Sequence, residues 1–297
     1  MKDKMNSYKT KERMSHILVP VILAFFMFLG LSVVNVKAET GFVKNDKGEY
    51  EIWDAAGFDE FKQEVFNGNK FSGETILLKN DISIQVDESV STKAFWGDFE
   101  GEGHLINYST DKFLKGKEVF PFSGAQGKVN NLKLNVVACE LENTASVSGS
   151  LFIPRTWQGI ISGVEASGTV KITLSSSDIS IWFSIFDFIK GEVKNCSSNV
   201  IFDVDASPEI LHNFSAYLCL SEFGSATSSS RTVYTNCFSY GKSEDKFATY
   251  LPEQLDEKSM IGITAFARTN TNCQFNNCYY DSTLMPMIYY GGDLELI

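Results

Sequence analysis

A twelve-residue stretch of this chain, GDFEGEGHLINY at positions 97–108, gathers residue types from which acid, base and metal chemistry is built. It holds Asp98, Glu100, Glu102 and His104 together with three glycines. Alternation along a strand would place the three carboxylates on one side. Such a group could bind Ca²⁺ or form the paired acid and base of a glycoside hydrolase. It could equally be the solvated face of a strand that ends at a glycine corner.

A second acidic pair, Asp203 and Asp205, has the same alternate spacing. Neither cluster lies within an Asp-rich turn, and neither contains a lysine or arginine that could abstract a proton in a lyase. We therefore interpret both as solvated outer faces, with a calcium site as the open alternative. In the first cluster, Phe95 and Phe99 should fill the core, Gly101 and Gly103 should permit a sharp corner, and His104 should hydrogen-bond there.

Other signals of catalysis are absent from the sequence. After residue 38 the chain has two histidines, His104 and His212, and neither has Glu or Cys at ligand spacing. A zinc site needs three or four converging ligands. No Gly-x-Ser-x-Gly elbow, phosphate-binding lysine loop or Cys/His pair occurs. We predict no catalytic residues, no metal site and no cofactor, and we assign no ligand-binding residues.

The chain has six cysteines, an even number that in an exported protein suggests disulfides. Three of them, Cys196, Cys237 and Cys278, follow a recurring asparagine, at the position that Leu132 and Val164 fill elsewhere. These three are predicted to form a buried stack of thiols. The other three are Cys139, Cys219 and Cys273, and a bridge between Cys273 and Cys278 stays open.

Aromatic residues are plentiful and could include a platform on which sugars stack, although core and cap contacts explain most of them. Those considered are Trp96, Trp157, Trp182, Tyr279, Tyr280, Tyr289 and Tyr290.

The chain contains an internal repeat, and the strands of this repeat would position the side chains described above. An apolar-x-Asn-(Leu or Cys) pattern places Asn at 131, 195, 236 and 277, with Gly163 in the same slot, at intervals of 32, 32, 41 and 41 residues. Alternating apolar stretches, typical of strands with one buried face, follow the first three slots. They are Leu132/Leu134/Val136/Ala138, Val170/Ile172/Leu174 and Val200/Phe202/Val204. Recurrent strands with a similar corner can stack as a β-solenoid, in which Asn and Gly tolerate tight corners and asparagines can form a hydrogen-bonded ladder.

A different pattern precedes the repeats. Residues 49–53 indicate a strand, and residues 54–67 a short amphipathic helix with Phe58, Phe61 and Val65 on one face and Asp54 as its cap. This helix would cover the open end of a solenoid, which otherwise exposes a sheet edge. We expect residues 39–72 to form the N-terminal strand and capping helix, and residues 73–297 to form the repeats.

The N-terminal residues predict export. Five basic residues precede an apolar run at 17–34, and Val36-Lys37-Ala38 places small residues where a signal peptidase cleaves. Residues 1–38 are therefore predicted to be a signal peptide, with membrane attachment only if it stays uncleaved. They hold six of the 26 Lys and Arg and two of the 37 Asp and Glu, so the remainder carries about −15. This charge disfavours nucleic acid and anionic lipid as partners.

The chain resembles right-handed parallel β-helix proteins exported by Gram-positive and gut bacteria. Three segments carry this resemblance: FNGNKFSGETILLKNDISI at 66–84, FWGDFEGEGHLI at 95–106 and GKVNNLKL at 127–134. Four segments are similar to the repeats of GLUG-motif surface proteins: SGVEASGTV at 162–170, VKNCSSNV at 193–200, TNCFSYGK at 235–242 and NNCYYDS at 276–282. The resemblance implies a secreted or surface, adhesin-like β-helix with no defined catalytic residues.

We therefore expect an all-β protein, a right-handed parallel β-helix with a short N-terminal amphipathic capping helix. The leading hypothesis for its function is a non-enzymatic, secreted or cell-surface binding module for glycans or host or matrix proteins. The alternative is a carbohydrate-active enzyme, a polysaccharide lyase or glycoside hydrolase, on the same scaffold.

Overall fold

The computed structural model describes residues 40–86, 93–110, 119–120, 122, 126–143, 147–153, 159–174, 181–186, 191–206, 219–221, 232–239, 242–243 and 273–280. The chain divides into two compact units, Met1–Glu39 and Thr40–Ile297, and all of these residues belong to the second. The predicted signal segment 1–38 lies outside them. None of the helices among the described residues is long and apolar enough to cross a membrane.

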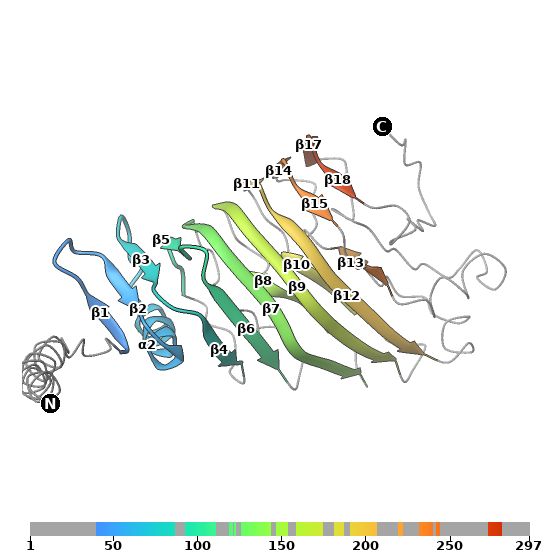
Figure 1. The fold of residues 1–297 in the computed structure, drawn as a ribbon, viewed down its shortest axis with the longest axis horizontal. Helices are drawn as coiled ribbons and strands as arrows, with labels where there is room; N and C mark the ends of the chain where they lie inside the picture. The colour runs from blue at the N-terminus through green and yellow to red at the C-terminus, as the bar shows by residue number, and fades with distance from the viewer. Residues whose placement is uncertain are drawn as a thin grey trace, which may run out of the picture. The chain divides into compact units, whose positions relative to one another are not determined.

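The described part is mostly β, with one helix, as Figure 1 shows. Its elements are β1 (Phe42–Lys44), β2 (Tyr50–Ile52), α2 (Ala55–Phe66), β3 (Thr75–Leu78), β4 (Ile82–Gln85), β5 (Asp98–Glu100), β6 (Leu105–Thr110), β7 (Lys128–Asn143), β8 (Val147–Ile153), β9 (Ile160–Leu174), β10 (Ile181–Phe186), β11 (Glu192–Lys194), β12 (Ser197–Ala206), β13 (Cys219–Ser221), β14 (Thr232–Thr235), β15 (Phe238–Ser239), β16 (Lys242–Ser243), β17 (Cys273–Asn276) and β18 (Tyr279–Tyr280).

A large, mainly parallel sheet of 15 strands dominates this part of the chain. Its main path runs β1-β2-β3-β5-β7-β9-β11-β14-β17, and of these pairs only β1 with β2 is antiparallel. A smaller parallel sheet has the order β13-β10-β8. Strands far apart in the sequence thus lie side by side (Figure 1).

The register of the sheet confirms the predicted repeat. One row of paired residues runs through Phe99, Val129, Ile161, Val193, Tyr234 and Phe275. Each of these residues except Phe99 lies two positions before a slot of the repeat, so all five slots occupy equivalent places. The intervals of 32 and 41 residues therefore each correspond to one return of the chain to the next strand.

The slot residues make the corners, as predicted. Asn131, Asn195, Asn236 and Asn277 have φ between 49° and 53°, and Gly163 has φ 63°. This left-handed region is costly for most residues, and Asn and Gly adopt it most readily. The corner amides also form a ladder, because Nδ2 of Asn236 donates to Oδ1 of Asn195 (3.1 Å) and Nδ2 of Asn277 donates to Oδ1 of Asn236 (3.4 Å).

The predicted thiol stack is present. Leu132, Val164, Cys196 and Cys237 are fully buried in successive rows, and Cys278 is half-buried in the next. Cys139, Cys196, Cys237 and Cys278 are free thiols, so the bridge between Cys273 and Cys278 is not formed.

The alternation predicted for residues 132–138 is wrong at its end. Leu132, Leu134 and Val136 are buried, but Ala138 is exposed and Cys139 is buried instead. The pairing of β7 with β6 and with β9 shifts register here, as a β-bulge does, and the bulge moves the next inward position by one residue. Val170 and Val200 are buried as expected, and the side chains of the other four predicted core positions in β9 and β12 lie outside the described set.

Helix α2 confirms the expected amphipathic helix. Asp54 is its N-cap and accepts the backbone N–H of Gly57 (2.8 Å). Phe58, Phe61 and Val65 are fully buried. The ring of Phe61 lies 5.5 Å from that of Phe95 and 5.9 Å from that of Phe99, so the helix packs on the phenylalanines of the stretch at 95–101.

Candidate functional site

The acidic stretch at 97–108 forms β5, a left-handed corner and the start of β6. Phe95 and Phe99 are buried, as predicted, and Gly97 and Gly101 are buried beside them. A Cβ on Gly101 would lie 2.5 Å from the backbone oxygen of Asn131, so this glycine permits close approach of the neighbouring strand. The corner was predicted at Gly101 and Gly103. Gly103 is left-handed (φ 80°), but the other left-handed residue is Glu102 (φ 51°) and not Gly101.

Each carboxylate of the stretch has a partner on a neighbouring segment. Lys128 Nζ lies 2.7 Å from Asp98, and Lys79 Nζ lies 2.7 Å from Glu102. Oε1 of Glu100 accepts from the Asn131 amide (2.8 Å) and from the backbone N–H of Glu102 (3.2 Å). These contacts tie neighbouring segments together and leave the three carboxylates in separate interactions.

His104 hydrogen-bonds at the corner, as predicted, with Nδ1 3.1 Å from Oδ1 of Asp81. The same oxygen accepts the backbone N–H of Leu105 (3.0 Å). That hydrogen bond, and secondly the one with His104, lowers the pKa of Asp81 below its ordinary value. The pair is a structural clamp between the segment before β4 and the segment before β6.

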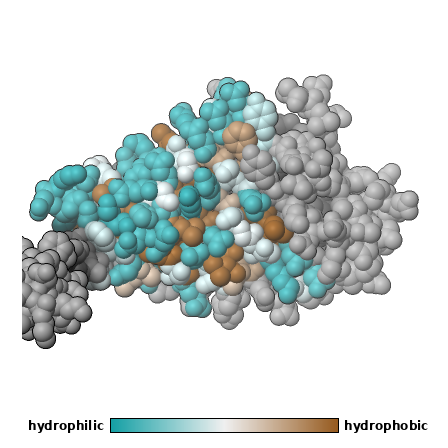
Figure 2. Space-filling view, in the orientation of Figure 1, coloured by the Kyte–Doolittle hydropathy of each residue, from teal (hydrophilic) through white to brown (hydrophobic). Residues whose placement is uncertain are grey.

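The second acidic pair, Asp203 and Asp205, lies on β12, which pairs with β9, β15 and β16 and not with β5 or β6. Asp203 lies opposite Lys171 in the pairing of β12 with β9, and Asp205 is exposed. Within the part of the chain that the structure describes, no three His, Cys, Asp or Glu side chains are placed to hold a metal ion. His212 lies outside that part. Figure 2 shows a surface over the first strands that is mostly hydrophilic, with scattered hydrophobic residues, as a solvated face should be.

Two exposed aromatic rings lie at the outward position just after the corners. Lys133, Glu165, Ser197, Phe238 and Tyr279 occupy this position in successive strands. The rings of Phe238 and Tyr279 stack with centroids 5.7 Å apart and planes 20° apart, and they are 36% and 59% exposed. The exposed corner amides of Asn195, Asn236 and Asn277 run beside them. We call these five residues, Phe238, Tyr279, Asn195, Asn236 and Asn277, the corner strip.

Other aromatic candidates are placed differently. Lys70 Nζ lies 4.2 Å from the centroid of the Trp96 ring, which is partly exposed. Trp182 and Tyr280 lie on β10 and β18, but their side chains are outside the described set, as are Trp157, Tyr289 and Tyr290 altogether.

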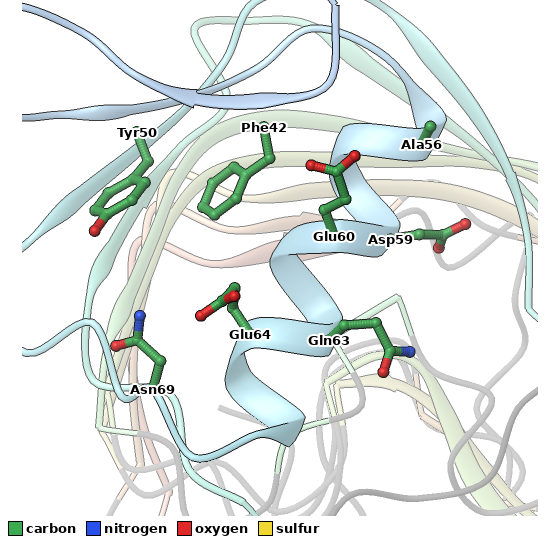
Figure 3. A pocket seen from close by; sticks show the side chains of 8 residues that line it. All are labelled: Phe42, Tyr50, Ala56, Asp59, Glu60, Gln63, Glu64 and Asn69. Carbon is green, nitrogen blue, oxygen red and sulfur yellow. The ribbon is translucent and has the colours of Figure 1, made fainter.

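A second candidate, which the sequence did not predict, is a hollow of about 730 Å³ between helix α2 and the β1–β2 hairpin. Figure 3 shows Phe42 and Tyr50 on one wall, Glu60 and Glu64 projecting from the helix on the other, and Asn69 below Tyr50. The volume lies within the range of small-ligand sites. We call this feature the cap hollow.

The walls of the cap hollow are fixed to each other at one end. The carboxylate of Asp54 accepts the N–H of Gly57 in the helix (2.8 Å) and the N–H of Gly41 before β1 (3.1 Å). Gly57 approaches Gly41 so closely that a Cβ on it would lie 2.2 Å from the Gly41 oxygen. The hairpin and the helix are therefore joined at this end of the hollow.

The aromatic wall is a stacked pair. The rings of Phe42 and Tyr50 are 5.0 Å apart and 17° from parallel. Lys44 Nζ lies 4.5 Å from the Tyr50 centroid and pairs with Glu74 at 3.2 Å. Its hydrogen bonds, first with Glu74 and then with Tyr50, raise the pKa of Lys44.

The opposite wall is acidic. Asp59 pairs with Lys62 (2.7 Å). No hydrogen bond or ion pair to another described residue engages the carboxylates of Glu60 and Glu64, which are exposed. The spacing of Glu60 and Glu64 on one helix face was visible in the sequence, but only the fold places the hairpin rings opposite them.

Comparison with known proteins adds little to this picture. No protein-family model matches the chain, and no curated protein matches it. The crystal structure of a "putative immunoglobulin A1 protease" from Bacteroides ovatus is similar at 12% sequence identity, over 85% of this chain and 81% of that one, with a TM-score of 0.44. The resemblance to GLUG-motif proteins stays a prediction.

Proposed function

We propose that this chain is an exported, non-enzymatic binding module, secreted or held at the cell surface, that is built on a right-handed parallel β-helix with α2 as its N-terminal cap. The equivalent slots, the left-handed corners and the inward stack from Leu132 to Cys278 all support the β-helix. A solenoid of this kind offers its outward positions and loops for binding.

The corner strip carries the proposal for function. Aromatic rings accept the apolar C–H faces of sugars, and side-chain amides can both donate to and accept from hydroxyl groups. Phe238 and Tyr279 place two stacked rings beside the amides of Asn236 and Asn277, all at the surface. We therefore favour glycans as the partner, ahead of host or matrix proteins, and an acidic surface argues against nucleic acid.

A glycan and matrix-protein panel tests this function. The full-length chain should bind at least one neutral glycan, and Tyr279→Ala should abolish or strongly weaken that binding. Val137→Thr is the matched control, because Val137 is 62% exposed and lies on β7 outside the strip. Binding to no member of the panel, or binding that Tyr279→Ala leaves unchanged, would contradict the proposal. Release of oligosaccharides from a polysaccharide panel would instead favour the enzymatic alternative.

A further inference from the structure

The cap hollow is lined by carboxylates and by aromatic rings, and both kinds of group attract cations. We propose that it binds the guanidinium or ammonium groups of a basic peptide segment from a partner protein. The inference does not depend on glycan binding by the corner strip, since the two sites share no residue.

The helix wall of the hollow is negatively charged. Glu60 and Glu64 are four residues apart on one face of α2, where like charges destabilise a helix. Asp59 is neutralised by Lys62, but no ion pair to a described residue neutralises Glu60 or Glu64. Two negative charges therefore face the aromatic wall and are left for a cation to compensate (Figure 3).

The hairpin wall of the hollow is aromatic. The faces of aromatic rings attract cations, more strongly as the cation loses water. Tyr50 already holds the ammonium group of Lys44, 4.5 Å from its ring centroid, and stacks on Phe42, so Phe42 is the ring left to contact a ligand cation. Phe42 stacks on Tyr50 and lies between it and Glu60, so a cation in the hollow would contact a ring and a carboxylate at the same time (Figure 3).

The size and openness of the hollow favour a peptide. A hollow of about 730 Å³ holds more than one side chain. Its acidic wall is exposed, so an extended chain can lie along the helix with its basic side chains against Glu60 and Glu64. The paired carboxylates suit the planar donors of arginine, which bind carboxylates through two parallel hydrogen bonds. The acidic net charge of the chain steers a basic partner toward it.

Binding of a fluorescent Gly-Arg-Gly-Arg-Gly peptide to the full-length chain, followed by anisotropy, tests the inference. Binding should be saturable, weaken with added salt, and be absent for the Gly-Glu-Gly-Glu-Gly peptide. The double variant E60Q/E64Q should bind about tenfold more weakly or worse, because two charge-assisted contacts are lost. Its melting temperature should be no lower than that of the wild type, because the like-charge pair is removed.

Two further variants and one competitor test whether the peptide binds at the hollow and not to the acidic surface in general. Glu165→Gln removes an exposed carboxylate on β9, away from the hollow, and should leave peptide binding unchanged. Phe42→Leu keeps the carboxylates and removes the ring, so it should weaken peptide binding, and unchanged binding would overturn the contact between the cation and the ring. The site would be overturned if Glu165→Gln weakened peptide binding as much as E60Q/E64Q does, or if E60Q/E64Q did not weaken it. Displacement of the peptide by equimolar spermidine would overturn the assignment to peptides, since a small amine would then suffice.

Discussion

The amide of Asn236 donates a hydrogen bond to the side-chain oxygen of Asn195 across 3.1 Å, and both residues have left-handed backbones, with φ of 53° and 52°. One residue type thus meets two demands of the corner. Its backbone tolerates the turn, and its side chain joins the corner to the next strand. Both demands recur at Asn277, whose amide donates to Asn236.

Two substitutions at Asn236 separate these two roles. Asn236→Ala should lower the free energy of unfolding by about 2 kcal/mol, from the left-handed backbone and the lost amide bonds together. Asn236→Gly keeps the backbone relaxed and should cost about half as much. Urea denaturation of both variants measures the difference. Equal midpoints for the two variants would show that the backbone conformation costs nothing here.

Much of the fold could be predicted because its determinants are local and repeated. Asn131, Asn195 and Asn236 mark corners by residue type, and the apolar position after each marks the inward stack. The bulge near Ala138 could not be predicted, because it depends on how β7 is paired with β6 and β9. The cap hollow could not be predicted for a similar reason. Phe42 and Glu60 lie in different elements, and only tertiary structure places them face to face.

Asp81 gives the protein a predicted acid sensitivity. Its pKa is lowered in the folded state, first by the Leu105 N–H and then by His104, so the unfolded chain binds this proton more readily. The stabilisation is present above the ordinary value of 3.8 and is lost as pH falls below it. The melting temperature of the wild type should therefore fall more steeply below about pH 4 than that of Asp81→Asn. Parallel curves of melting temperature against pH for the two proteins would contradict the stabilising contact of Asp81 with Leu105 and His104.

The buried thiols should be unreactive in the folded protein. A hydrogen bond with Cys196 is the main cause that raises the pKa of Cys237 to about 12, and burial alone raises that of Cys139 to about 12. The thiolate is the reactive form, so iodoacetamide should label both cysteines very slowly at pH 8. Mass spectrometry of peptides after native labelling, and again after labelling in guanidinium chloride, checks this. Rapid native labelling of Cys237 would mean that its part of the stack opens.

The acidic stretch at 97–108 should have no calcium-dependent role. Asp98 and Glu102 are each paired with a lysine of another segment, at 2.7 Å, so a bound Ca²⁺ would have to break both pairs. Added Ca²⁺ should leave the melting temperature unchanged. Asp98→Asn should cost no more than about 1 kcal/mol, because the pair it removes is largely exposed. A rise in melting temperature with Ca²⁺ that Asp98→Asn abolishes would restore the metal hypothesis, whereas a rise that survives this substitution would place the ion elsewhere on the chain.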